Sequence, residues 1–189
     1  ELMILFLNVV TVLGAYLLGK NLWQNRWAGI LVAAALALAP YRAVDLMVRT
    51  ALSEAWAIAF LPWILLAVIG LVEGKRWSWL ILTLSLSALF LSHNLTALIA
   101  LPFLLCFTVF YVMWRLPQWR QRFTAFWRLL PPTVLSLVLT SFYLFPMWLE
   151  KSFTQIDQFV LSSYFDYRQH FLYIRQLLEP WGAWEYGGS

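Results

Sequence analysis

Long apolar runs alternate with short basic stretches along this chain. The runs are built almost entirely from Leu, Ala, Ile, Val, Phe and Trp, and the stretches that divide them are Lys20–Trp27, Glu73–Trp77 and Arg115–Arg128. Glu73 is the only acidic residue in these three stretches. A helix rises about 1.5 Å per residue, so crossing a hydrocarbon core of about 30 Å takes roughly 20 apolar residues. The pattern predicts an all-α, polytopic transmembrane bundle.

We expect about six transmembrane helices within residues 1–149. The predicted spans are residues 2–19, 27–41, 55–72, 77–92, 95–114 and 129–149. The uncharged run Trp77–Trp114 is much too long for one crossing, so a hairpin is placed at its polar cluster, Ser92–Asn94. Trp27–Tyr41 is short, but it can cross if Arg26 and Arg42 extend their side chains to the interface, or if the helix continues past Pro40. If residues 27–41 formed a re-entrant loop instead of a crossing, the basic connections would no longer alternate with the other connections along the chain.

The remaining residues, 150–189, form the one long polar stretch of the chain. They mix aromatic and charged side chains, and we expect them to form an outward-facing segment. The chain opens inside an apolar run without an initiator Met and ends on Gly-Gly-Ser, so we read it as a fragment of a larger membrane protein.

Composition excludes a water-soluble domain and gives the orientation of the bundle. Hydrophobic residues make up 62% and charged residues 12%, whereas a soluble domain has about 25% charged residues. Because Lys and Arg favour the cytoplasmic side, loops 20–27, 73–77 and 115–128 are predicted to be cytoplasmic. Tyr41–Glu54 and Ser92–Asn94 then face outward. The same bias accounts for the net charge of +4, so no nucleic-acid partner is predicted, and the expected partner is membrane lipid.

The densest polar chemistry lies in Tyr41–Glu54, which follows a helix-breaking Pro40. If this segment is one helix, its 3.6-residue period places four polar side chains within about one sixth of the circumference: Arg42, Asp45, Arg49 and Ser53. Glu54 would then point away by about a third of a turn. The segment is therefore predicted to hold guanidinium and carboxylate groups at the outer mouth of the bundle.

These groups suit a phosphorylated lipid headgroup. Arg42 and Arg49 can match phosphate oxygens with their planar forks. Asp45 or Glu54 could act as a general base or hold a divalent metal ion, although no cofactor and no metal ligand set is predicted. Because successive spans cross the membrane in alternating directions, His93 is predicted to lie on the same side of the membrane as Tyr41–Glu54. It could shuttle protons there.

Simpler interpretations stay open for each of these groups. Asp45 and Arg49 have the spacing of an ordinary i,i+4 ion pair, and His93 and Asn94 could merely cap a hairpin. The candidate site residues are nevertheless kept as two sets. The catalytic candidates are Asp45, Glu54 and His93, and the substrate-binding candidates are Tyr41, Arg42, Arg49 and Asn94.

One resemblance adds to this interpretation. The pattern Pro40-Tyr41-Arg42-x-x-Asp45-x-x-x-Arg49-x-x-x-x-Glu54, a following span with Pro62, and Ser92–Thr96 resemble a family of bacterial membrane proteins, the 6-pyruvoyl-tetrahydropterin synthase related family. Its layout is similar to GT-C glycosyltransferases and to membrane proteins of the YfhO type. A pterin synthase needs a zinc site of three histidines, whereas this chain has only two.

The GT-C likeness implies a function in the bacterial inner membrane. Such enzymes transfer a sugar from a polyprenyl-phosphate donor and use an acidic residue in the first outer loop as the base. That loop would precede Glu1, so Asp45 matches only a secondary acidic position. Three hypotheses follow: a glycosyltransferase of envelope glycan assembly, a non-catalytic protein that binds or transports a lipid-linked headgroup, or a structural membrane scaffold.

Overall fold

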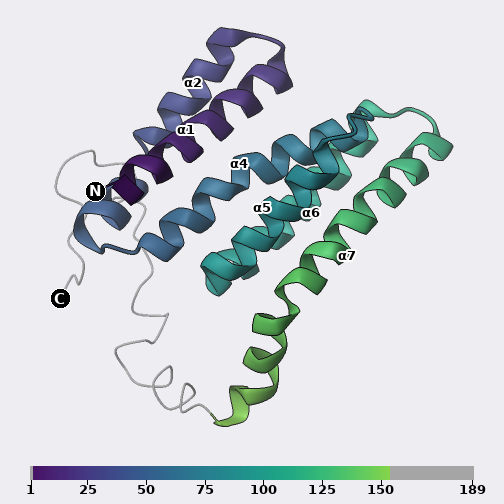
Figure 1. Ribbon diagram of the computed structural model, residues 1–189. Coiled ribbons are helices and arrows are strands. Elements are labelled where there is room, and N and C mark those ends of the chain that lie inside the picture. The colour runs from purple at the N-terminus through teal and green to yellow at the C-terminus, as the bar shows by residue number, and fades with distance from the viewer. Residues whose placement is uncertain (1, 154–189) are drawn as a thin grey trace, which may run out of the picture. The chain divides into compact units, whose positions relative to one another are not determined.

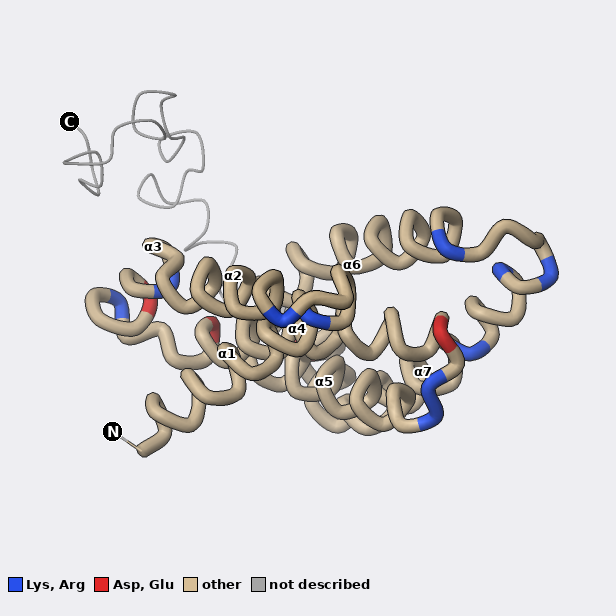
Figure 2. The backbone as a smooth tube through the Cα atoms, turned by 90° about the horizontal axis from the view of Figure 1, so that it is seen from above, with Lys and Arg blue, Asp and Glu red and all other residues tan. Residues whose placement is uncertain are grey.

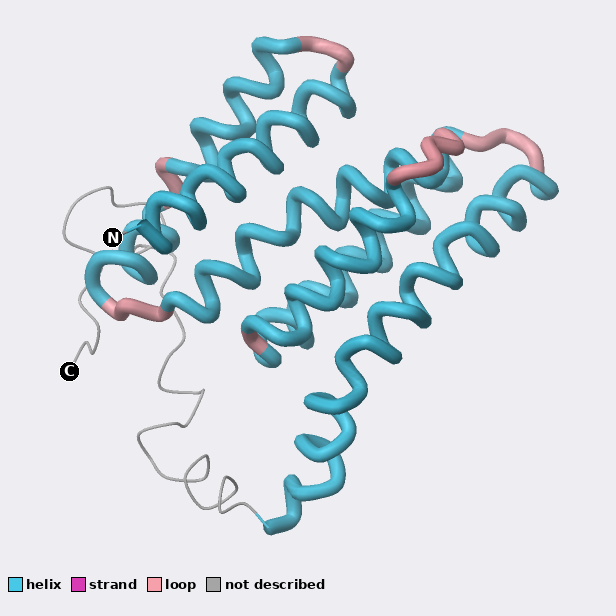
Figure 3. Tube along the Cα trace, viewed as in Figure 1, coloured by secondary structure: helices cyan, strands magenta, loops and turns pink. Residues whose placement is uncertain are grey.

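The computed structural model describes residues 2–153, which form helices joined by short connections (Figure 1). No strand occurs among these described residues (Figure 3). Nearly all of the predicted outward segment, residues 150–189, lies outside them. The chain divides into two compact units, Glu1–Leu144 and Phe145–Ser189. The helices that position the candidate site belong to the first unit.

Five of the six predicted spans each lie on a single helix, whereas residues 27–41 are divided between α2 and α3. In chain order the elements are α1 (Leu2–Trp23), α2 (Arg26–Ala37), α3 (Pro40–Ala43), the π-helix η1 (Val44–Val48), α4 (Leu52–Val72), α5 (Ser78–Ser92), α6 (Asn94–Arg115), α7 (Trp119–Leu149) and the 3₁₀-helix η2 (Glu150–Phe153). The predicted hairpin at Ser92–Asn94 is confirmed, because α5 ends and α6 begins there. The predicted break at Pro40 is confirmed as well, since Pro40 opens α3.

Four helices, α1, α4, α6 and α7, are long and apolar enough to cross a membrane. At 12 residues α2 is only about 18 Å long. It reaches the necessary length only together with residues 40–48, from which it is bent by 47°. α5 is a shorter apolar helix of 15 residues. The predicted helical membrane bundle is confirmed, while six separate crossings stay a prediction.

The basic stretch before the last span is mostly helix, where a loop was predicted. α7 begins at Trp119 and includes most of Arg115–Arg128, because Arg, Gln and Leu are good helix formers whatever their charge. Pro131 and Pro132 therefore lie well inside α7. The Pro132 carbonyl accepts a hydrogen bond from the Thr83 hydroxyl of α5 at 3.3 Å.

α4 is the central helix of the first unit. In the most apolar stretch of α4, 61% of the residues are buried. The corresponding share is 28% in α1, 22% in α7 and 17% in α6. Its buried face packs against α5, where Ile64 and Val68 meet Leu82 and Leu89 in one core cluster. The outer helices instead expose large apolar side chains, such as Leu98, as expected where lipid is the solvent.

Glycines allow α1 to approach its two neighbours closely. A Cβ atom added to Gly29 of α2 would lie 2.7 Å from the Tyr16 carbonyl oxygen of α1. On another face of α1 the Trp63 indole covers Gly14 and donates a hydrogen bond to the Val10 carbonyl at 3.0 Å. Such small-residue contacts are typical of membrane helix pairs. They fix α1 against both α2 and α4.

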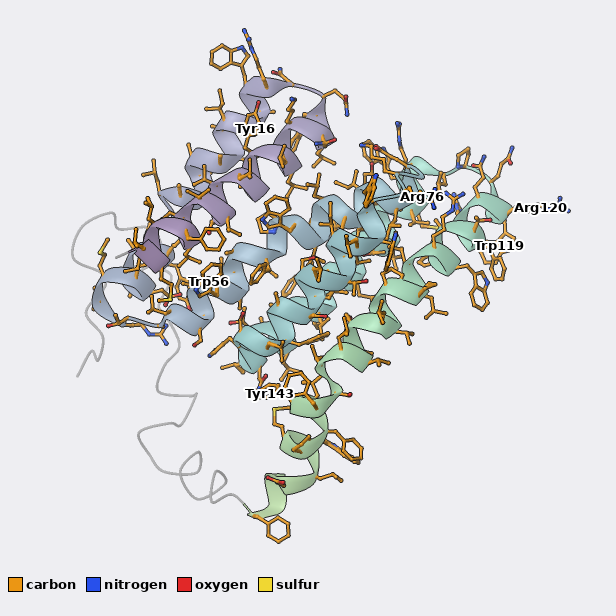
Figure 4. The ribbon with its side chains drawn as sticks, viewed as in Figure 1. Tyr16, Trp56, Arg76, Trp119, Arg120 and Tyr143 are labelled. Carbon is orange, nitrogen blue, oxygen red and sulfur yellow. The ribbon has the colours of Figure 1, made fainter. Side chains whose placement is uncertain are left out.

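Charged side chains gather at two ends of this unit. One end, called the basic end below, carries the α1–α2, α4–α5 and α6–α7 connections, and Arg76, Trp119 and Arg120 lie there (Figure 4). Figure 2 shows basic and acidic positions together beside α3, and mainly basic ones at the α6–α7 connection. The α3–η1 segment and the α5–α6 hairpin lie away from the basic end (Figure 3). The predicted alternation of connections is thus present in the fold.

Candidate functional site

The candidate site is built on the abrupt connection between α2 and α4. After α3, the π-helix η1 widens the backbone, and the Arg49 amide donates to the Val44 carbonyl at 2.9 Å. The Ala51 amide donates to the Asp45 carbonyl at 2.8 Å. Thr50 has a φ of +51°, in the left-handed region that non-glycine residues rarely adopt. This reversal starts α4 in a new direction and brings its first turn back over η1.

The prediction that Tyr41–Glu54 forms one helix was therefore wrong. Ser53 lies on α4 and is exposed, so it does not share a face with Asp45. Glu54 faces the cluster instead of pointing away from it. The physical reason is the left-handed turn at Thr50, which no helical period can anticipate.

Arg49 is the centre of a small charged cluster. Its Nη1 atom lies 3.0 Å from Asp45 Oδ1 and 3.4 Å from Glu54 Oε2. The same atom donates to the Tyr41 hydroxyl at 3.4 Å, and that hydroxyl donates to Glu54 Oε1. The i,i+4 ion pair that the sequence left open is thus formed. The tyrosine and Glu54 extend it into a network.

Exposure differs sharply among the three charged groups. The Arg49 side chain is 40% exposed, that of Glu54 13% and that of Asp45 0%. The hydrogen bond with Tyr41, more than the nearby carboxylates, raises the pKa of Arg49 above its ordinary value. Arg49 and Glu54 can therefore meet a ligand, whereas Asp45 can act only through its neighbours.

Arg42 is buried beneath this cluster and contacts α1. Only 4% of the residue is exposed. Its Nη2 donates to Asn8 Oδ1 at 2.6 Å and to Thr11 Oγ1 at 3.4 Å. Among the described residues no carboxylate forms an ion pair with it, and its Nε has no hydrogen-bond partner. A buried guanidinium among apolar helices is costly and is commonly kept for a function.

The sequence did not reveal that Asn8 and Thr11 belong to this site. Both lie in the first apolar run, which was interpreted only as a charge-free span. Asn8 also donates to the Ile4 carbonyl at 2.9 Å, so its amide is held in place. The polar side chain of Asn8 within an otherwise apolar run was the one feature of the sequence that could have indicated this contact.

The α5–α6 hairpin uses its polar side chains in hydrogen bonds within the protein. His93 is the N-cap of α6, where its Nδ1 accepts from the Thr96 amide at 3.2 Å. Asn94 Nδ2 donates to the Tyr143 hydroxyl of α7 at 3.0 Å. The capping role that the sequence left open for His93 is thus present. A catalytic role for His93 and a binding role for Asn94 stay predictions.

An apolar cavity of about 540 Å³ opens beside the charged cluster. Tyr41 and Glu54 supply polar groups to its lining, and Thr96 supplies a hydroxyl from the α5–α6 hairpin. The rest of the wall comes from the facing sides of α4 and α6. These residues are Ile58, Leu61 and Leu65 of α4, and Ile99, Ala100, Phe103, Leu104 and Phe107 of α6. The site thus joins a charged mouth to an apolar compartment.

A second cavity, of about 430 Å³, lies among α4, α5, α6 and α7. Of the described residues that line it, only Thr108 and Thr133 bear a hydroxyl group and none is charged. Within the described residues, no three His, Cys, Asp or Glu side chains gather where they could hold a metal ion. Of these two cavities, only the first is lined by a charged side chain, that of Glu54.

Comparison with protein families gives a match over nearly the whole chain. The family described as 6-pyruvoyl-tetrahydropterin synthase related domain, membrane protein, matches residues 1–187. The chain therefore belongs to this membrane protein family, which confirms the family resemblance seen in the sequence, while the likeness of its layout to GT-C and YfhO-type proteins stays a prediction. No curated protein and no solved structure matches the chain.

Proposed function

We propose that this membrane protein binds a lipid-linked, phosphorylated headgroup at the mouth formed by Tyr41, Arg49 and Glu54. The lipid chain would occupy the apolar cavity between α4 and α6. The observation that carries this proposal is the junction itself, where a cavity of about 540 Å³ with mostly apolar walls meets a charged mouth. A polyprenyl phosphate bearing a sugar has this combination of headgroup and chain.

Arg49 is the group that would recognise the phosphate. The contacts that the described residues make with its guanidinium all use Nη1, and its side chain is 40% exposed. A guanidinium has five N–H donors in a planar fork that matches phosphate oxygens. Arg42 would contribute to phosphate binding only from beneath the mouth, because its side chain is buried and hydrogen-bonded to α1.

The headgroup, more than the chain, must supply the affinity. A lipid chain that leaves the bilayer for an apolar cavity exchanges one apolar environment for another, so the hydrophobic effect contributes little. A hydrogen bond to a charged group contributes about 1.5–3 kcal/mol, which is about a ten- to hundredfold change in affinity. The cavity would instead determine which chains fit.

Glycosyl transfer is the second candidate function, and Glu54 favours it. In a GT-C-like enzyme a carboxylate must reach the acceptor hydroxyl, within hydrogen-bond distance. Glu54 lines the cavity, whereas Asp45 is fully buried. We therefore assign the role of base to Glu54 and a positioning role to Asp45, which holds Arg49. The setting would be glycan assembly at the outer face of a bacterial inner membrane, with the basic end in the cytoplasm.

The binding proposal is tested with the full-length protein in lipid nanodiscs. A polyprenyl phosphate and the neutral polyprenol of equal length are offered as probes, and retention is measured by native mass spectrometry. Wild type should retain the phosphate preferentially, and Arg49→Gln should lose that preference by about ten- to hundredfold. Arg120→Gln at the basic end is the matched control and should keep it. Equal retention of both probes by wild type would refute the proposal.

The transfer proposal needs a separate measurement. Glu54→Gln should keep phosphate binding but release sugar from a polyprenyl-phosphate sugar about 10²–10⁴ times more slowly, because a general base contributes that much. Unchanged release by Glu54→Gln would leave the binding function standing and remove this role for Glu54.

A further inference from the structure

Asp45 is a buried carboxylate held by one exposed cation. The residue is 0% exposed, and among the described residues the only hydrogen bond to its carboxylate is from Arg49 Nη1 to Oδ1, at 3.0 Å. Its second oxygen, Oδ2, has no hydrogen-bond partner there. A buried carboxylate stays ionised only if charge and hydrogen bonds compensate for its loss of water. At this position the compensation depends on Arg49.

A phosphorylated headgroup would compete for that same cation. Arg49 Nη1 is shared between Asp45 and Glu54, so a phosphate at Arg49 draws the guanidinium away from both carboxylates or neutralises its charge. Glu54 would still accept a hydrogen bond from the Tyr41 hydroxyl and is partly exposed. Asp45 would be left buried with neither a hydrogen bond nor an adjacent counter-ion.

The other ionisable groups around Asp45 do not replace Arg49. Arg42, on the same segment, forms no ion pair with Asp45 and donates instead to Asn8. Glu54 of α4 is itself acidic and opposes ionisation of Asp45. His93, at the α5–α6 hairpin, acts on Asp45 only electrostatically and is held by Thr96. The α1 side chains near the cluster, Asn8 and Thr11, are neutral.

We propose that Asp45 takes up one proton from solvent when an anionic headgroup engages Arg49, so that binding at this site is coupled to protonation. This inference rests on the proposed headgroup binding and adds a regulatory device to it. The step is a simple proton transfer, in which the carboxylate becomes a neutral carboxylic acid and no other bond changes. By linkage, a ligand whose binding takes up a proton binds more tightly as pH falls, by up to about tenfold per pH unit.

The experiment measures protons directly. The full-length protein in nanodiscs is titrated calorimetrically with a polyprenyl phosphate at one pH, in two buffers of different ionisation enthalpy. For wild type the binding heat should differ between buffers in proportion to the proton taken up. For Asp45→Asn, which keeps the size of the side chain, the difference should disappear while binding remains. Glu73→Gln, which removes a carboxyl group at the end of α4 and at the basic end, should keep the proton uptake.

Each outcome decides a different point. Failure of wild type to bind the phosphate would overturn both the proposed function and this inference. Binding with equal heats in both buffers would overturn the inference alone, as would proton uptake that survives in Asp45→Asn or vanishes in Glu73→Gln. If Asp45→Asn does not fold, infrared difference spectra of wild type and Asp45→Glu give the answer. Both should show the carbonyl stretch of a carboxylic acid on ligand addition, at a different frequency in each, and its absence or an unchanged frequency would overturn the proposal.

Discussion

Replacing Arg42 tests the buried polar contact that fixes η1 against α1. In Arg42→Met the side chain keeps much of its apolar volume but loses the 2.6 Å hydrogen bond to Asn8 Oδ1 and the 3.4 Å contact with Thr11. The Asn8 oxygen is then left without its donor in an apolar environment, which costs about 1–3 kcal/mol. Removal of the buried charge opposes this loss, because an isolated guanidinium is itself unfavourable there.

A double-mutant cycle separates the two effects. Arg42→Met and Asn8→Leu should each lower the free energy of unfolding by about 1–3 kcal/mol, because each leaves one polar partner unsatisfied. The double variant should be close to wild type, because replacing a whole buried polar group by apolar side chains is often neutral. Unfolding in mixed micelles with increasing denaturing detergent measures each value. Additive losses, or an Arg42→Met protein as stable as wild type, would refute the described contact.

Two other substitutions test the helix packing and the cavity. Gly29→Leu should destabilise the protein in the same unfolding assay, because the new side chain meets the Tyr16 carbonyl, whereas Ala35→Leu on the exposed face of α2 should be neutral; equal effects would contradict the close α1–α2 contact. Ile99→Trp should weaken retention of a polyprenyl phosphate in nanodiscs by filling the cavity, whereas Leu98→Trp, on the neighbouring lipid-facing position, should not; equal retention by both would argue against the cavity as the chain site.

The helices themselves could be predicted from the sequence because run length and turn chemistry are local. A charge-free run of about 20 residues has few alternatives in a membrane. Pro40 cannot continue α2, and the polar cluster around His93 is the one place where a very long apolar run can turn. The ends of α7 were less predictable, because Arg120 and Arg122 are compatible with a helix that extends beyond the lipid.

The site could be predicted only in part, because its geometry depends on contacts between distant segments. Arg49 and Asp45 are four residues apart, so their ion pair followed from spacing. The return of Glu54 depends on the left-handed backbone at Thr50, and threonine carries no signal for that conformation. The contact of Arg42 with Asn8 joins residues 34 positions apart, and only the packing of α1 on the α3–η1 segment creates it.

The most direct test of the account asks on which side of the membrane each end lies. Met47 and Arg120 are both exposed, whereas a cysteine at the position of Asp45 would be too buried to react with a labelling reagent. In a Cys106→Ala background, Met47→Cys should react with a membrane-impermeant maleimide added to intact cells. Arg120→Cys should react only after permeabilisation. Labelling of both positions from the same side would contradict an outward-facing site opposite a cytoplasmic basic end.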